Sequence, residues 1–193
     1  MNGDLIKRDD FKVNKEGSFS ITRPYESYQI VEIMQECVGT LKDLIITDST
    51  ACMGGDTISF SKVCRFVNSV EIDKDNFKCL LENCKRFNCQ NVNPFCDDYL
   101  NICDSLFQDI IYMDPPWGGI DYKTKKEVKL KLGNIELKTI LGDIRKNKLA
   151  KYVFVKIPLN MCLDFIRYDD IRVIYNKGKS ETFKLLIIYS ERG

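Results

Sequence analysis

Residues 110–119 read IIYMDPPWGG and form the stretch that decides the fold. The apolar run from Ile110 to Met113 is typical of a short buried strand. Pro116 keeps Pro115 out of the helical region, Pro115 does the same to Asp114, and neither proline has a backbone N–H to donate. We therefore expect the strand to end in a stiff, extended turn, and this turn carries Trp117, the only tryptophan of the chain.

The turn has the groups needed to hold a flat ring that bears an exocyclic amine. The Asp114 carboxylate and the free carbonyls of the turn can accept the hydrogens of the amine, while the indole of Trp117 stacks on the ring. The alternative is a tight turn with a packed tryptophan and a capping aspartate. The strand before the turn and the Trp-Gly-Gly sequence after it favour the ring-binding interpretation.

The composition predicts one globular, intracellular domain over residues 1–193. A net charge of +1 with 30% charged residues argues against a basic surface that covers long nucleic acid, and leaves room for a local basic patch. No apolar run reaches the ~18 residues of a membrane helix, so no membrane partner is expected. The N-terminus is polar and of mixed charge, which is not typical of a signal peptide.

The cysteines and the missing histidines limit the chemistry. The nine cysteines are odd in number, none forms a C-x-x-C pair, and the chain has no histidine, so no structural metal site is expected. Free cysteines indicate a reducing compartment: nucleus or cytoplasm, or the host cytoplasm for a viral protein. Without histidine, catalysis must depend on positioning or on carboxylates, lysine or tyrosine.

The chain begins with a charged arm and an amphipathic helix. Thr22 is expected as the N-cap of that helix. Its apolar face follows three-to-four spacing and comprises Ile30, Ile33, Met34, Cys37 and Leu41.

Strands and helices then alternate, which predicts a parallel sheet covered by helices on both faces. The first four strands are expected at residues 44–47, 66–72, 91–96 and 110–113, and each is followed or closed by an acid: Asp48, Glu71, Asp98 and Asp114. Parallel sheets bind ligands at the carboxyl ends of their strands. The four acids therefore predict a pocket for adenosine, a ribose diol and an amine-bearing acceptor.

Three further strands are expected at residues 151–157, 171–175 and 183–189, with Asn176–Lys179 as the turn of a C-terminal hairpin. Residues 121–150 are rich in lysine and poor in acids. Their pattern fits a solvated loop and helix face or a flap that contacts phosphates, and the sequence leaves both interpretations open.

The pattern PPWGGxDY at residues 115–122 resembles the trimethylguanosine synthase family, the RNA cap guanine-N2 methyltransferases. The family's EGWFSVTP appears at residues 16–24, and its DxxxGxGGxT appears at residues 48–57. Asn176 and Lys179 match part of its closing NxxKT pattern. The resemblance covers roughly residues 15 to 190.

This resemblance implies a Rossmann-like class I methyltransferase fold: a seven-stranded, mostly parallel sheet with helices on both faces and a C-terminal antiparallel hairpin. Residues 1–42 would form an N-terminal arm and helix that contribute to the substrate site, and residues 43–193 the core. The implied reaction moves a methyl group from S-adenosylmethionine to the 2-amino group of a 7-methylguanosine cap on RNA.

The resemblance also implies roles for individual residues. The catalytic residues would be Asp114, Pro115 and Trp117. The cofactor would contact Asp48, Thr50, Gly54, Glu71, Ile72, Asp98, Asp114 and Pro116. The capped substrate would contact Trp117, Ser20, Lys156, Asn160 and Tyr122.

The chain departs from the family pattern at four positions. Cys52 replaces the first glycine of the cofactor turn, Ser18 replaces a tryptophan, Arg23 is inserted before Pro24, and Leu159 stands where the family carries a basic residue. Two alternatives therefore stay open. One is an adenine exocyclic-amine methyltransferase on RNA or DNA, and the other is a cap-binding module that has lost transfer.

Overall fold

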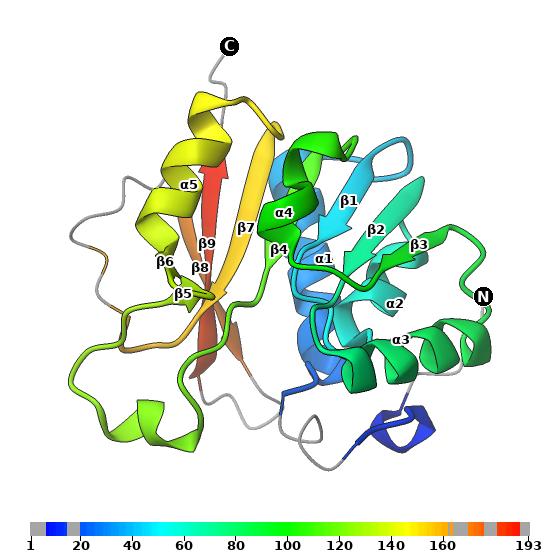
Figure 1. The fold of residues 1–193 in the computed structure, drawn as a ribbon, viewed down its shortest axis with the longest axis horizontal. Coiled ribbons are helices and arrows are strands. Elements are labelled where there is room, and N and C mark those ends of the chain that lie inside the picture. The colour runs from blue at the N-terminus through cyan, green and yellow to red at the C-terminus, as the bar shows by residue number, and fades with distance from the viewer. Residues whose placement is uncertain (1–6, 15–19, 162, 164–169, 176–180, 190–193) are drawn as a thin grey trace. The chain divides into compact units, whose positions relative to one another are not determined.

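A computed structural model describes residues 7–14, 20–161, 163, 170–175 and 181–189. It divides into two compact units, an N-terminal unit of Met1–Leu106 and a C-terminal unit of Phe107–Gly193. Figure 1 shows the helices and strands of both units. The single-domain organisation stays a prediction.

The N-terminal unit is built on three parallel strands in the order β3-β2-β1 (Figure 1). The strands are β1 (Ile45–Asp48), β2 (Phe66–Val70) and β3 (Val92–Phe95). The helices are α1 (Pro24–Val38), α2 (Gly55–Ser61), α3 (Lys74–Arg86) and α4 (Tyr99–Ile102), with short 3-10 turns η1 (Arg8–Asp10) and η3 (Cys103–Ser105). The register of β1 on β2 places Asp48 beside Ser69.

The start of α1 corrects one prediction. Thr22 does not cap this helix: its N-cap residue is Arg23, in an extended conformation, and Pro24 occupies the first turn, where a missing N–H costs nothing. The Thr22 hydroxyl instead donates to Asp56 Oδ2 at 2.6 Å, and both side chains are buried. Thr22 therefore ties the segment before α1 to the first turn of α2.

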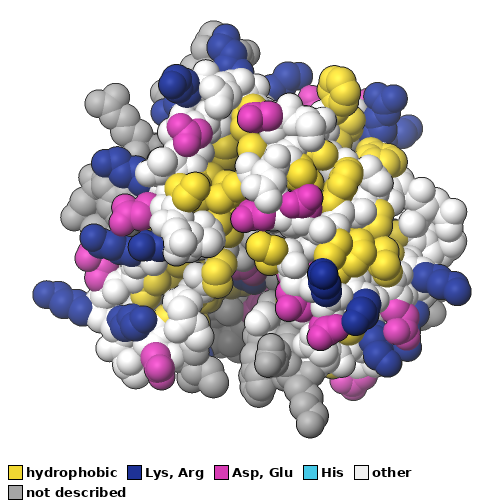
Figure 2. Space-filling model, in the orientation of Figure 1, with side chains coloured by type: hydrophobic (Ala, Val, Ile, Leu, Met, Phe, Trp, Pro, Cys, Tyr) yellow, Lys and Arg dark blue, Asp and Glu magenta, His cyan; other side chains and the backbone are white. Residues whose placement is uncertain are grey.

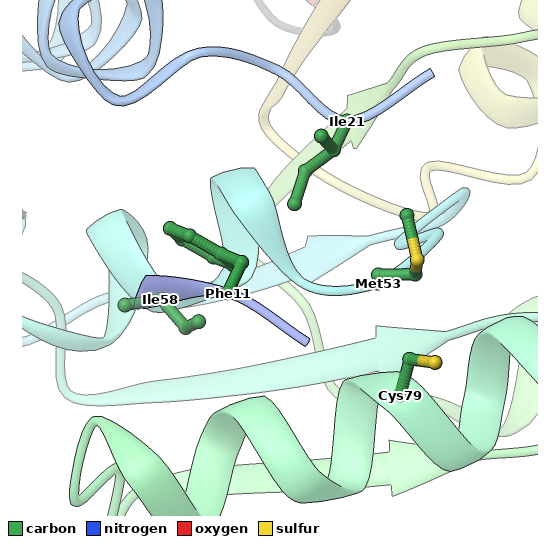
Figure 3. Close-up of a cluster of buried hydrophobic side chains, with 5 residues drawn as sticks. All are labelled: Phe11, Ile21, Met53, Ile58 and Cys79. Atoms are coloured by element: carbon green, nitrogen blue, oxygen red, sulfur yellow. The ribbon is translucent and has the colours of Figure 1, made fainter. Parts of the chain in front are cut away.

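The charged arm packs against the core of the unit, which its sequence did not indicate. Phe11 is buried in a cluster with Ile21, Met53, Ile58 and Cys79 (Figure 3). The fully buried Asn83 of α3 fixes the neighbouring backbone: its amide nitrogen donates to the carbonyls of Lys12 and Met53, at 2.9 and 2.8 Å, and its Oδ1 accepts from the Lys12 N–H at 2.7 Å.

The C-terminal unit contains four strands in the order β4-β7-β9-β8. The strands are β4 (Ile110–Met113), β7 (Tyr152–Ile157), β8 (Asp170–Tyr175) and β9 (Glu181–Tyr189). β4 and β7 are parallel, whereas β9 runs antiparallel to both β7 and β8. The predicted α/β fold with mostly parallel strands and a C-terminal antiparallel pair is confirmed. Its predicted turn, residues 176–179, lies outside the described residues.

The lysine-rich stretch of this unit contains more regular structure than expected. It comprises the 3-10 helix η4 (Ile120–Thr124), a small hairpin of β5 (Lys131–Leu132) and β6 (Ile135–Glu136), and the helix α5 (Leu137–Lys146). Val128, Leu130 and Leu132 are buried. The two interpretations of the sequence, a solvated loop and helix face or a flap that contacts phosphates, did not include this hairpin.

No helix among the described residues has the length and apolar character to cross a membrane. None of the eight described cysteines forms a disulfide. The described part of the chain also contains no group of three or more side chains arranged to hold a metal ion.

Candidate active site

The turn between β1 and α2 is anchored by Asp48. This carboxylate is 1% exposed, and its Oδ2 accepts a 2.6 Å hydrogen bond from the Thr57 hydroxyl of α2. The Thr57 hydroxyl also lies 2.8 Å from Ser69 Oγ on β2. Asp48 therefore fixes the first turn of α2 to the carboxyl ends of β1 and β2.

Glu71 links this turn to the next one. Its Oε2 accepts the N–H of Cys52 at 2.7 Å, and its Oε1 accepts the N–H of Asp73 at 2.8 Å. Burial raises the pKa of Glu71 above its ordinary value, while the two backbone N–H groups act in the opposite direction. One carboxylate is thus held beneath both turns that follow β1 and β2.

Cys52 adopts a backbone conformation that glycine accommodates more readily than other residues. Its φ is 50°, in the left-handed region that L side chains rarely occupy. Gly54 has a φ of 90°, and a Cβ added there would lie 2.8 Å from Leu80 Cδ1. The turn therefore forms with cysteine at the first position, whereas a side chain at Gly54 would be strained by its φ and would require Leu80 to shift.

The other predicted residues of the N-terminal unit lie on or near the surface. Ile72, directly after Glu71, is 66% exposed, which is unusual for an isoleucine with no role at the surface. Asp98 is half-buried and caps α4 by accepting the Leu100 N–H at 3.0 Å. Thr50 is half-buried and Ser20 is exposed.

In the C-terminal unit, Asp114 forms an ion pair with Lys156. Lys156 Nζ lies 2.8 Å from Asp114 Oδ2, and the side chains are only 8% and 19% exposed respectively. The same ammonium lies 4.7 Å from the ring centre of Phe183 and 5.8 Å from that of Trp117. Lys156 therefore fixes the Asp114 carboxylate and places a positive charge over the indole.

Trp117 is half-buried and is held by aromatic neighbours. The edge-on contacts with Tyr122 and Phe183 have ring-centre distances of 5.0 and 6.4 Å. Its Nε1 is shielded from solvent and has no acceptor among the described residues. Gly118 and Gly119 follow with φ of 90° and 75°, so the chain leaves the tryptophan through two left-handed positions.

Asn160 and Lys184 take positions that the sequence did not reveal. The Asn160 amide nitrogen donates to the carbonyls of Tyr122 and Lys125, both at 2.8 Å, so it supports the segment after Trp117. Lys184 of β9 donates from Nζ to the Leu159 carbonyl at 3.2 Å. A lysine thus lies beside Leu159, the position where the family pattern has a basic residue. The sequence gives no sign that Lys184 lies near Leu159. Their proximity follows from the β7–β9 register, in which Lys184 pairs with Ile157.

The predicted site residues therefore fall into two sets, one in each unit. The cofactor set in the N-terminal unit comprises Asp48, Thr50, Gly54, Glu71, Ile72 and Asp98, with Ser20 as a predicted substrate contact in the same unit. The set in the C-terminal unit comprises Asp114, Pro115, Pro116, Trp117, Tyr122, Lys156 and Asn160. Of these, Asp114 and Pro116 were also predicted to contact the cofactor. Pro115 is buried and Pro116 is exposed.

The motifs that surround these two sets match a known family. Residues 43–189, well over half of the chain, match the family model described as RNA cap guanine-N2 methyltransferase. The chain belongs to this family. The resemblance noted from the PPWGGxDY pattern is thereby confirmed.

Proteins similar in sequence to this chain include a viral protein and a fungal enzyme. Uncharacterized protein L320 of Acanthamoeba polyphaga mimivirus is 31% identical over 151 residues, covering 77% of this chain and 58% of the viral protein. Trimethylguanosine synthase of Schizosaccharomyces pombe is 26% identical over 140 residues, covering 67% of this chain and 56% of the enzyme. The chain thus spans just over half the length of these relatives.

Solved structures confirm the fold. A putative methyltransferase from Porphyromonas gingivalis W83 has a TM-score of 0.68 at 13% identity, covering 93% of this chain and 43% of that one. The 16S rRNA N2 G1207 methyltransferase of T. Thermophilus, solved with AdoMet and guanosine, has a TM-score of 0.64 at 14% identity, covering 93% and 44%. The family member therefore has the fold of S-adenosylmethionine-dependent methyltransferases.

Proposed function

We propose that the protein transfers a methyl group from S-adenosylmethionine to the 2-amino group of a 7-methylguanosine cap on RNA. The observation that carries this proposal is the turn after β4, where a half-buried Trp117 follows an Asp114 carboxylate that Lys156 holds in place. A carboxylate, turn carbonyls and an indole are the groups that a planar, amino-bearing base requires.

In this proposal the N-terminal unit would supply the contacts to the cofactor. Glu71 would accept the ribose hydroxyls, because its carboxylate is already held at the end of β2 by two backbone N–H groups. The exposed Ile72 would cover one face of the adenine. Asp98 and the turn through Thr50 and Gly54 would contact the rest of the molecule. S-adenosylmethionine, when bound, supplies a methyl group that is already activated on sulfur.

Asp114 and the Pro115 carbonyl would act on the acceptor amine. The lone pair of the 2-amino nitrogen is normally delocalised into the purine ring, so the amine is a weak nucleophile. Two hydrogen bonds from the amine to these acceptors favour the pyramidal form, in which the lone pair is available. Lys156 keeps the Asp114 carboxylate oriented by its 2.8 Å bond to Oδ2. The methyl donor is already activated, so positioning can supply several kcal/mol, up to roughly 7–11 kcal/mol.

Trp117 would select the methylated base. Guanine methylated at position 7 is cationic, and stacking on the indole gains a cation–π contribution of about 1–2 kcal/mol that neutral guanine lacks. Tyr122, which contacts the Trp117 ring at 5.0 Å, keeps the indole in place. Lys184 lies beside the Leu159 carbonyl and would supply positive charge for the cap phosphates.

The direct test is incubation with a 7-methylguanosine cap dinucleotide and isotope-labelled S-adenosylmethionine, followed by mass analysis of the product. A mass increase located on the guanine 2-amino group supports the proposal. Transfer to an adenine oligomer instead supports the adenine alternative, and cap binding without any transfer supports the binding-module alternative. Trp117→Ala should weaken binding of the cap analogue far more than binding of the cofactor, and equal losses would argue against the stack.

A further inference from the structure

The segment after Trp117 presents lysines in a regular row. From Glu127 to Leu132 exposed and buried residues alternate: Val128, Leu130 and Leu132 are buried, whereas Glu127, Lys129 and Lys131 are exposed. This period of two is typical of an extended chain with one face packed and one face in solvent. Lys129 and Lys131 therefore lie on the same side, about 7 Å apart along the chain.

The row is held by backbone contacts, so it is a fixed surface. The Val128 N–H donates to the Asn160 carbonyl at 3.2 Å, and Val128 pairs with Met161 in an isolated parallel bridge. The Leu137 N–H donates to the Leu130 carbonyl at 2.9 Å, at the start of α5. The β5–β6 pairing fixes the far end, at Lys131 and Leu132.

An open cavity of about 460 Å³ joins this row to the acceptor turn. It is lined by Pro116, Trp117, Gly118, Lys125, Glu127, Val128, Lys129, Lys131 and Gly133. Lys125 reaches toward the turn, because a Cβ placed on Gly118 would lie 3.6 Å from its Nζ. The three lysines therefore line one continuous cavity that begins at the predicted base-stacking residue.

The charge of this region is strongly biased. Residues 121–150 contain nine basic and four acidic side chains, a net charge of +5, whereas the whole chain carries +1, so the remaining residues carry −4. Figure 2 shows lysine and arginine side chains on the α5 side of the view, with acidic side chains among them. No carboxylate of the described residues lies within ion-pair distance of Lys125, Lys129 or Lys131. These charges are available to an anionic ligand.

We propose that Lys125, Lys129 and Lys131 bind the phosphodiester backbone of the RNA chain that follows the cap. The inference rests on the proposed function and deepens it: the substrate is a capped RNA rather than the cap nucleotide alone. The cavity lining includes residues from the tryptophan turn to Gly133, and we assign the lysines along it to phosphates beyond the cap. A positive groove that begins at an aromatic residue is typical of single-stranded nucleic acid sites.

The test compares three ligands by fluorescence anisotropy or calorimetry: 7-methylguanosine triphosphate, a capped single-stranded RNA of about 12 nucleotides, and the same RNA without the cap. The test variant is Lys129→Gln with Lys131→Gln. Its matched control, Lys126→Gln with Lys146→Gln, removes the same charge from exposed lysines of the same stretch that do not line the cavity. Glu127→Gln removes the one acid of the cavity lining.

We expect the wild-type protein to bind capped RNA more tightly than 7-methylguanosine triphosphate. The test variant should lose on the order of tenfold in affinity for both RNAs, and the slope of log affinity against log salt should fall by about 1.4, since each phosphate contact to a single strand contributes about 0.7. Affinity for 7-methylguanosine triphosphate should not change. Glu127→Gln should tighten RNA binding.

The inference is wrong if the test variant binds both RNAs as the wild type does, if the control pair loses as much, or if 7-methylguanosine triphosphate is weakened equally. Failure of the proposed function looks different. In that case the protein binds the capped RNA and the same RNA without the cap equally well, while the contribution of the RNA chain and its loss in the test variant persist.

Discussion

Replacing Lys156 by methionine should increase the preference of the protein for 7-methylguanosine over guanosine. Methionine keeps a long apolar side chain but removes the ammonium that lies 2.8 Å from Asp114 and 5.8 Å from the Trp117 ring centre. Guanine methylated at position 7 is cationic and guanine is neutral. Only the methylated base is therefore repelled by Lys156.

The size of the effect follows from the geometry. The Lys156 ammonium lies 5.8 Å from the Trp117 ring centre, on one side of the indole. A base stacked about 3.5 Å from the opposite face of the indole would therefore lie about 9 Å from the ammonium. With an effective dielectric constant of about 20, two unit charges at about 9 Å repel each other by about 2 kcal/mol. A change of about 2 kcal/mol corresponds to roughly 30-fold in the ratio of the two affinities.

The assay measures the affinities for 7-methylguanosine triphosphate and guanosine triphosphate by calorimetry, and compares their ratio among four proteins. The ratio cancels phosphate contacts and any loss of folded protein, which affect both ligands equally. Asp114→Asn should lower the ratio, because it leaves Lys156 without its counter-charge. The double variant removes both charges and should return close to the wild-type ratio. An unchanged or lower ratio in a folded Lys156→Met variant would refute the reasoning.

Three further predictions concern the N-terminal unit. Cys52→Val should lower the free energy of unfolding by about 1–2 kcal/mol, because a branched side chain fits the left-handed conformation poorly. Cys52→Gly should change the free energy of unfolding by less than about 1 kcal/mol, and urea denaturation measures both variants. Asn83→Ala removes three hydrogen bonds made by a fully buried side chain and should cost about 3 kcal/mol in the same assay. A loss below about 1 kcal/mol would show that Asn83 does not hold the arm. Binding of S-adenosylhomocysteine should weaken as pH falls, because the proposed ribose contact needs an ionised Glu71. Burial raises the pKa of Glu71, so the loss of affinity should begin at a pH above the ordinary glutamate pKa of about 4.3. Glu71→Gln should remove this pH dependence.

Local patterns of the sequence predicted most of the fold. The strand before Asp114 was visible because four apolar residues end at two prolines, whose covalent geometry allows few alternatives. The acids Asp48 and Glu71 were found because they follow short apolar runs at the end of a strand. In both cases the signal lies within a few residues of the feature that it predicts.

Features that depend on distant partners could not be read in this way. Thr22 has the residue type of an N-cap, but its hydroxyl bonds Asp56, 34 positions further along the chain. Asn83 contacts Lys12 across 71 positions, and Lys156 reaches Asp114 across 42. No local pattern distinguishes these side chains from solvent-exposed ones, since their partners are set by the packing of helices and strands.

The alternation of aliphatic and lysine side chains from Glu127 to Leu132 restricts how this segment can vary in length. Insertion of a single residue within it would turn the following lysines toward the interior and the following aliphatic residues toward water. Insertion of two residues would keep both faces. Changes of length in this segment that keep the folded arrangement are therefore expected in even steps.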